Sequence, residues 1–291
     1  MNTMLVDISD LSYRYPGASD WTLRGINLSA REGEFILLAG PSGCGKSTLA
    51  RVLNGLIPNF YGGEIHGSIN VCGLDPREHP TYEFAECVGF VFQNPENQLF
   101  FNTVERELAF GLENLGLPRD EIVRRVEKSL REYQLLELRD RSPFELSGGQ
   151  QQRVAIASVM VMNPRILVLD EPTANLDPLT ALHVLALVRR KVSEEGVLAI
   201  VIEHRLEVAL PFATRVIVMQ DGKIVEDGSP YSTLKRYGHI VGFTPALKLL
   251  ELLEEGGVEI SPNGVSPEKI ALAIVELFRG RGYGGGRGSS H

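Results

Sequence analysis

A glycine-rich run at residues 40–48, GPSGCGKST, combines residue types that bind phosphate groups. It follows an apolar stretch and precedes a helical pattern, the context in which a G-x-x-x-x-G-K-[ST] match is meaningful. Glycines let successive backbone N–H groups and the helix start point at the α- and β-phosphates. Lys46 then reaches the β- and γ-phosphates, and the Ser47 hydroxyl can ligate Mg²⁺. The run predicts a nucleoside triphosphate site.

Two adjacent acids end a second apolar run, ILVLDEP at residues 166–172. Asp170, at the end of the expected strand, can hold Mg²⁺ through water. Glu171, one position further, can orient or deprotonate an attacking water. Two solvated acids that only cap a strand are the alternative, and the phosphate-binding run elsewhere in the chain argues against it. The pair predicts hydrolysis of the bound triphosphate.

A third motif, LSGGQ at residues 146–150, opens a helical pattern with a serine at the cap position. Ser147 follows Lys46 by 101 positions (147 minus 46). A helix start with exposed N–H groups is an anion site, and the chain's own nucleotide does not need it. In isolation such a run is more often a simple turn. The spacing of LSGGQ from Lys46 and the presence of the two other motifs favour a second phosphate contact.

With these motifs in this order, the sequence resembles the ABC ATPase family, whose signature motif is LSGGQ. The resemblance implies ATP and Mg²⁺ as cofactors and a dimer in which ATP is sandwiched between two ATPase subunits. Ser147 and Gly149 would then contact ATP bound to the partner. Tyr15 matches the aromatic residue on which adenine stacks through the ring face. A strand-end tyrosine without this role is the alternative for that position.

Three further positions match the family in chain order. Gln93 matches the glutamine that joins the Mg²⁺ and water shell and senses the transport partner, and Asp177 matches the acid that contacts the other subunit. His204 matches the histidine that holds the γ-phosphate. The resemblance implies catalytic roles for Glu171, His204, Gln93 and Lys46, metal contacts for Ser47, Gln93 and Asp170, and nucleotide contacts for Tyr15, Gly40, Pro41, Ser42, Gly43, Cys44, Gly45, Lys46, Ser47, Thr48, Ser147, Gly149, Gln150 and Asp177.

The residues before His204 depart from the family pattern, because Ile202 and Glu203 stand where many relatives carry small hydroxyl residues. A neighbouring acid favours the charged form of histidine. We therefore expect Glu203 to raise the basicity of the His204 ring.

The stretches QNPENQLFF at residues 93–101 and AFGLENLG at residues 109–116 closely resemble the ATPases of energy-coupling-factor transporters. That family imports vitamins, cobalt or nickel, so the resemblance implies a translocase ATPase. Its partners would be a transmembrane coupling protein and, through it, a substrate-binding membrane protein. Residues 93–101 would form part of a groove for coupling helices. The alternatives are that Leu99, Phe100 and Phe101 are ordinary core, and that the chain is a soluble non-transport ABC ATPase.

The composition fits a large folded domain with an appendage, because 43% of the 291 residues are hydrophobic. A formal net charge of −8 gives no footprint for nucleic-acid binding, so no nucleic acid is expected. Neither an apolar run of spanning length nor a secretory signal is visible, which predicts a cytoplasmic chain held at the cell membrane by partners. Cys44, Cys72 and Cys87 lack C-x-x-C spacing, which predicts reduced thiols.

These chemical groups need a sheet to position them, and the pattern predicts an α/β fold of the ABC type. Apolar runs at 35–39, 166–169 and 197–202 predict central strands, and alternating runs at 5–15 and 22–30 predict an antiparallel β subdomain. Helical patterns occur at 46–55, 119–133, 149–162 and 178–193, and a hairpin at 216–227. We expect an ATPase domain over 1–234 with a helical subdomain at about 94–163, a helical extension over 235–280 and a glycine-rich tail over 281–291.

Overall fold

A computed structural model describes residues 3–242, 245–255 and 275 of the chain. Its main sheet has six strands in the order β5-β6-β7-β3-β8-β9. Neighbours from β5 to β8 run parallel, and β9 pairs antiparallel with β8. The strands are β3 (Phe35–Ala39), β5 (Val88–Val91), β6 (Ile166–Asp170), β7 (Leu198–Ile202), β8 (Arg215–Gln220) and β9 (Lys223–Gly228).

The central strands β3, β6 and β7 are buried along their whole length. Side chains alternate between the faces of a strand, so a strand covered on both faces must be apolar throughout. In β3, Phe35 and Leu37 join one hydrophobic core, whereas Ile36 and Leu38 join the other. The sheet thus separates two cores, and the predicted central strands are confirmed.

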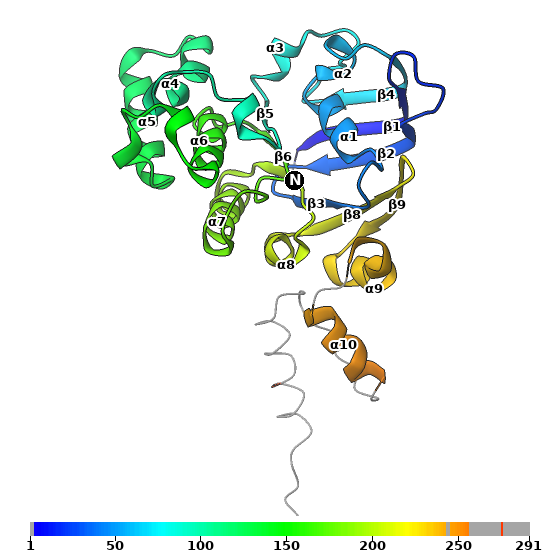
Figure 1. Cartoon of the computed structure of the whole chain (residues 1–291). Coiled ribbons are helices and arrows are strands. Elements are labelled where there is room, and N and C mark those ends of the chain that lie inside the picture. Colours follow the sequence, from blue (N-terminus) through cyan, green and yellow to red (C-terminus); the bar gives the residue numbers. More distant parts are fainter. Residues whose placement is uncertain (1–2, 243–244, 256–274, 276–291) are drawn as a thin grey trace, which may run out of the picture.

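A second sheet of three antiparallel strands, ordered β2-β1-β4, packs on the same core as α1. Its strands are β1 (Met4–Arg14), β2 (Leu23–Arg31) and β4 (Glu64–Val71). Figure 1 shows this sheet beside α1, with β1 and β2 in blue and β4 in cyan. The antiparallel β subdomain predicted from the alternating runs is therefore present.

Helices cover both faces of the main sheet, and α4, α5 and α6 form a lobe on the side opposite the antiparallel sheet (Figure 1). Within the placed part of the chain, no helix combines the length and apolar content needed to cross a bilayer. The helices are α1 (Lys46–Leu53), α2 (Leu56–Asn59), α3 (Thr81–Phe84), α4 (Val104–Asn114), α5 (Arg119–Glu132), α6 (Gly148–Met160), α7 (Pro178–Glu195), α8 (Leu206–Ala209), α9 (Pro230–Val241) and α10 (Pro245–Glu255). Short 3₁₀ turns lie at Pro95–Asn97, Leu136–Leu138, Pro143–Glu145 and Leu210–Phe212.

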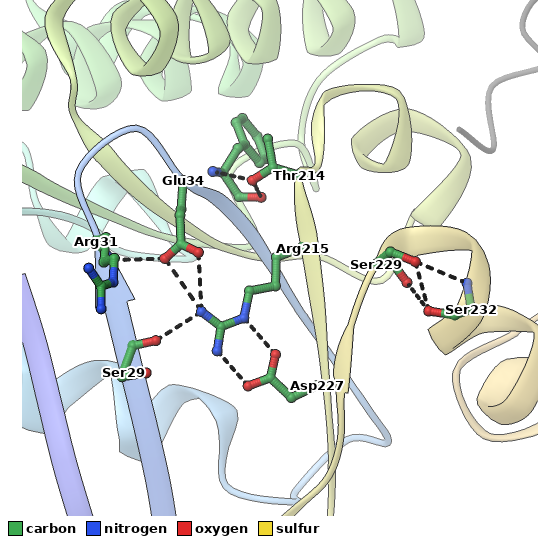
Figure 2. Close-up of polar contacts among 9 residues, drawn as sticks. Ser29, Arg31, Glu34, Thr214, Arg215, Asp227, Ser229 and Ser232 are labelled. Carbon is green, nitrogen blue, oxygen red and sulfur yellow. Dashed lines mark hydrogen bonds and ion pairs between the residues drawn. The ribbon is translucent and has the colours of Figure 1, made fainter. Parts of the chain in front are cut away.

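Arg215, at the start of β8, ties the two sheets together (Figure 2). Its Nε and Nη2 donate to the two carboxylate oxygens of Asp227, each at 2.6 Å. Its Nη1 donates to the carbonyl oxygen of Ser29 in β2 at 2.9 Å and to Glu34 at 3.2 Å. Hydrogen bonding to Asp227, and then the nearby charges, raise the pKa of the guanidinium. One side chain therefore joins β2, β8, β9 and the residue before β3.

The cysteine prediction is wrong for two of the three residues. Cys72 and Cys87 form a disulfide, with their Cα atoms 6.7 Å apart. Cys72 lies in the turn after β4, and Cys87 immediately precedes β5. The fold brings these strand ends together, and sequence spacing alone carries no sign of that proximity.

The carboxyl-terminal part of the chain is described only in part. The predicted domain boundary at residue 234 falls inside α9, where Leu234 is fully buried in the core. Within the helical extension expected over 235–280, the structure has α10, which lies below α9 in Figure 1. Beyond residue 255 only residue 275 is described, so the rest of the expected extension and the tail expected over 281–291 lie outside the described residues.

Candidate active site

The phosphate-binding run forms a tight loop between β3 and α1. Gly40 has φ 148°, and a Cβ there would lie 2.1 Å from the carbonyl oxygen of Met219. Gly45, at φ 107°, caps α1 in a left-handed conformation that favours glycine. Lys46 is 5% exposed, and its Nζ donates to the carbonyl oxygens of Gly40 and Pro41 at 2.8 and 2.9 Å. The lysine is therefore held inside the loop.

The other predicted loop residues divide by exposure. Pro41, Ser42 and Gly43 are exposed at the tip, whereas Cys44 and Thr48 are buried. Burial raises the pKa of the Cys44 thiol, and the charge of Lys46 opposes this only in part. The thiol therefore stays protonated at neutral pH, and we assign it no chemical step.

Asp170 ends β6 and is 5% exposed. Its Oδ1 is buried and has no hydrogen-bond partner among the described residues, although the Ser47 hydroxyl hydrogen-bonds the carboxyl group. Burial raises the pKa of Asp170, and the charge of Glu171 adds to this. A buried carboxylate oxygen without a partner, beside a hydroxyl of the phosphate loop, is suited to a hard cation such as Mg²⁺. These two residues fit the metal role that the sequence predicts.

Two other predicted residues, Gln93 and His204, contact Glu171. The Nε2 of Gln93 donates to Glu171 Oε2 at 2.8 Å, and the Nε2 of His204 lies 3.3 Å from Oε1. The three follow β5, β6 and β7, which are neighbours in the main sheet. Parallel strands present their carboxyl ends at one edge, where open α/β sheets place their ligands. Glu171 also has φ 50°, a conformation uncommon for a residue with a side chain.

Glu203 contacts other groups than we expected. Its carboxylate accepts from the Thr173 hydroxyl and from the backbone N–H groups of His204 and Arg205, the latter two at 2.9 and 3.1 Å. The carboxylate that contacts the His204 ring belongs to Glu171. Among the described contacts none joins Glu203 to the ring, so the expected effect of Glu203 on the ring stays a prediction. Glu203 is 3% exposed, and it fixes the backbone from which the ring projects.

Tyr15 lies beside the phosphate loop, as its predicted role requires. Its side chain is half-buried, and its hydroxyl oxygen is 3.2 Å from Thr48 Oγ1. Thr48 is the last residue of the loop motif, so the tyrosine and the loop are joined directly.

The remaining predicted contacts form a separate, exposed group. Ser147 caps α6, where its Oγ accepts from the Gln150 backbone N–H and the Gln150 side chain accepts in return. Asp177 caps α7, and the Thr180 hydroxyl holds the pKa of its carboxyl group below the usual value. A Cβ at Gly149 would lie 3.4 Å from the Asn175 carbonyl oxygen, close to Asp177 in the chain. Among the described residues, no hydrogen bond joins this group to Glu171 or Lys46.

The sequence comparisons agree with this geometry. The family described as ABC transporter matches residues 23–174, which carry the loop, the signature motif and the acid pair. The chain belongs to the ABC transporter ATP-binding family. A Methanosarcina mazei relative with the provisional name ABC transporter ATP-binding protein is 49% identical over 94% of this chain, which spans about half (47%) of that relative's length. A Pyrococcus horikoshii relative with the same provisional name is 48% identical over 78% of the chain and 80% of its own length.

Solved ABC structures share the fold. The structure of cbiO1 from Clostridium perfringens, described as part of the ABC transporter complex cbiONQ, has a TM-score of 0.71 and 31% identity. It covers 87% of this chain and 100% of its own. The ATP-binding cassette MJ0796, solved as a dimer bound to ADP and Pi after hydrolysis, has a TM-score of 0.69 and 28% identity over 77% of this chain and 98% of its own. The ABC-type α/β fold predicted from the motifs is confirmed.

The ABC domain also carries an apolar groove of about 510 Å³ beyond Gln93. Phe100 and Phe110 line it, with ring centroids 4.9 Å apart, and Tyr82 lines it from α3. Phe100 is 55% exposed and Phe101 is half-buried, whereas Leu99 is 4% exposed. Leu99 is therefore core, as the alternative interpretation held, and Phe100 is open to a partner.

Glu107 is a residue of this groove that sequence reasoning missed. It is 4% exposed, and one carboxylate oxygen accepts from the backbone N–H groups of Phe100 and Phe101 at 3.0 and 2.8 Å. These bonds fix the loop that presents Phe100. The signal in the sequence was weak, because one glutamate among several in a helix gives no sign of burial.

Proposed function

We propose that the chain binds Mg²⁺-ATP and hydrolyses it as one half of an ATP-sandwiching dimer. One observation carries this proposal: Gln93 and His204 converge on Glu171 at the sheet edge from which the phosphate loop begins. The ABC family match and the dimeric post-hydrolysis cassette MJ0796 support it.

In this reaction, the backbone N–H groups of residues 40–48 cradle the phosphates. Lys46 exchanges its present carbonyl partners for the β- and γ-phosphate oxygens. Glu171 orients a water and accepts its proton as the water oxygen attacks the γ-phosphorus. The bond between the γ-phosphorus and the β–γ bridging oxygen breaks, and ADP and phosphate leave. His204 donates a hydrogen bond to the γ-phosphate, and Gln93 shares the water shell. Ser47, Asp170 and Gln93 would hold Mg²⁺, which when bound neutralises charge on the phosphates.

The second subunit would complete the site. Ser147 and Gly148 at the start of α6 are exposed. Capping engages the N–H groups of Ser147 and Gln150, so those of Gly148 and Gly149 would meet the γ-phosphate bound to the other subunit. A Cβ at Gly149 would lie 3.4 Å from the carbonyl oxygen of Asn175, two positions before Asp177, and this proximity supports a shared role for the signature motif and Asp177. A second copy or a related ATPase can present this surface.

We further propose that the ATPase energises a membrane importer of the energy-coupling-factor type, for a vitamin or for cobalt or nickel. The similarity to cbiO1, described as part of the complex cbiONQ, supports this branch. The groove beside Phe100 has the aromatic lining that suits the apolar side of a coupling helix. The chain would then lie at the cytoplasmic face of the membrane, held by a transmembrane coupling protein and, through it, a substrate-binding membrane protein.

The experiment that tests hydrolysis is Glu171→Gln. The glutamine keeps the size of the side chain but cannot accept the proton, so turnover should fall by about 10² to 10⁴ while ATP affinity persists. Phosphate release measures turnover, and light scattering with Mg²⁺-ATP should show a stable dimer. A monomeric variant with wild-type turnover would contradict the assignment.

A further inference from the structure

Tyr15 belongs to a group of three tyrosines whose rings meet edge to face. The ring centroid of Tyr15 lies 5.0 Å from that of Tyr13 and 6.2 Å from that of Tyr61. Tyr13 is fully buried, and its hydroxyl donates to the Gly62 carbonyl oxygen at 2.9 Å. Burial raises the pKa of Tyr13 to about 12, so this hydroxyl stays protonated. Tyr13 is therefore a fixed neighbour of the Tyr15 ring.

Arg51 binds two members of this group from α1. Its Nη1 donates to the Tyr15 hydroxyl oxygen at 3.1 Å, and its guanidinium lies 4.9 Å from the centroid of the Tyr61 ring. A planar guanidinium can lie over one ring and donate from its edge in a fixed geometry, whereas a lysine ammonium is a point charge without such a fork. Thr48 adds a second contact to the same hydroxyl. The Tyr15 ring is thus held from the helix that begins at the phosphate loop.

The position of the Arg51 side chain lowers the stability of the fold, so a purely structural role does not explain it. Its Nε is buried and has no hydrogen-bond partner among the described residues. An unpaired buried donor is destabilising. Such costs are expected where a side chain serves function.

We propose that Arg51 is the positioning residue for nucleobase recognition. With Tyr61, it sets the orientation of the Tyr15 ring and its separation from the phosphate loop, so that one purine nucleoside triphosphate reaches both. This inference rests on the proposed role of Tyr15 as the adenine platform. Arg51 itself acts through Tyr15 and touches neither the base nor the phosphates.

A competing role for Arg51 runs through the metal site. Its positive charge lowers the pKa of Asp170, against the larger effect of burial. A change at Arg51 that acted through Asp170, or through the stability of α1, would weaken binding of the phosphates themselves. A ligand that has phosphates but no base separates the two roles.

The test compares Mg²⁺-ATP with Mg²⁺-tripolyphosphate by calorimetry on the full chain, with Glu171→Gln in every variant to prevent turnover. Arg51→Gln should lower ATP affinity about tenfold, or about 1.4 kcal/mol, because the base stacks less well on a displaced ring. It should leave tripolyphosphate affinity unchanged. Arg51→Lys keeps the positive charge near Asp170 but cannot hold both tyrosines, so it should behave like Arg51→Gln. An equal loss for both ligands would overturn the proposal.

Two further variants separate this inference from the proposed function. Tyr15→Phe removes the hydroxyl that Arg51 binds, so adding Arg51→Gln to it should cause little further loss of ATP affinity. Tyr15→Ala should abolish the preference for ATP over tripolyphosphate. If Tyr15→Ala leaves that preference intact, the adenine role of Tyr15 fails and this inference with it. If Tyr15→Ala abolishes it while Arg51→Gln preserves it, only the positioning role of Arg51 is refuted.

Discussion

Glu171 shows how much of this site depends on single residues. Glu171 directly follows the last residue of β6. Its backbone φ of 50° turns the carboxylate toward Gln93 and His204. Side-chain residues adopt this region at a cost of about 1–3 kcal/mol, which persists where the surroundings enforce it. The backbone N–H of Glu171 donates to the Ile202 carbonyl oxygen at 2.9 Å, so β7 holds the residue in that conformation.

Asp170 gives a pH-dependent prediction at the same scale. Burial raises its pKa in the folded, metal-free protein above the unfolded value. The folded state therefore keeps a proton that the unfolded state loses, so this carboxyl lowers stability as pH rises from the unfolded pKa through the folded pKa. Asp170→Asn should have a higher urea midpoint than wild type at pH 7 in EDTA, and the difference should vanish near pH 3. Equal midpoints at pH 7 would show that burial of this carboxylate carries no penalty.

The motifs alone single out most residues of the candidate site, because their spacing and chain order can be read directly from the sequence. Lys46, Asp170 and Glu171 could be assigned before any geometry was known. The contacts of Glu203 and Arg51 could not, since each depends on which groups the fold brings within hydrogen-bond distance. A pair such as Arg51 and Tyr15, 36 positions apart, leaves no local pattern.

At the scale of elements, prediction followed burial. Strands β3, β6 and β7 have continuous apolar runs because both faces are covered, so they were easy to predict. Strand β4 was missed because most of its residues are exposed or half-buried and its apolar alternation is weak. The sequence analysis does not predict helix α9, although Ser229 and Pro230 are helix start signals. The expected domain boundary at residue 234 lies four residues after Pro230 and divides this helix.

Arg215 provides a prediction about how the elements hold together. Arg215→Ala would leave Glu34 and Asp227 without their shared cation and would break the contact to β2. The arginine side chain is 21% exposed, so we expect a loss of about 2 kcal/mol in the free energy of unfolding, less than for a fully buried pair. Urea unfolding measures it. Arg124→Ala, which removes a surface pair with Glu121, is the matched control and should cause a much smaller loss. Equal losses would refute the bridging role.

In the molecule as a whole, the candidate residues fall into two groups. Ser47 of the phosphate loop hydrogen-bonds Asp170 beside Glu171, whereas Ser147 and Asp177 share no hydrogen bond with that group among the described residues. A shared dimeric site predicts complementation. Neither Ser147→Arg nor Lys46→Ala should hydrolyse ATP alone, because each homodimer lacks half of both sites.

Mixing these two variants should restore part of the activity, because a mixed dimer keeps one site with an intact loop and an intact signature motif. Phosphate release at several mixing ratios, with a maximum near equal amounts, would support the shared site. Monomer ATP affinity should remain normal for Ser147→Arg. A mixture as inactive as its components would place the signature motif outside the catalytic site.

The groove beside Phe100 allows a test of coupling to a membrane partner. Phe100→Ala removes an exposed aromatic side chain from the groove, and such truncations cost upwards of about 2 kcal/mol at the centre of an interface. Basal ATP hydrolysis should survive, while retention of the membrane partner in a detergent pull-down should fail. Leu136→Ala, an exposed apolar change outside the groove, should retain the partner. Normal assembly of Phe100→Ala would show that the coupling helix binds elsewhere.

The double burial of β3 also constrains how this chain can vary in evolution. One inserted residue would exchange the side chains that enter the two cores and would shift the phosphate loop by about 3.3 Å. We therefore expect insertions and deletions within residues 35–48 to abolish folding or nucleotide binding. The exposed turn at residues 16–20 should tolerate them. Among homologous proteins, the length of this segment should therefore vary far less than its amino-acid sequence.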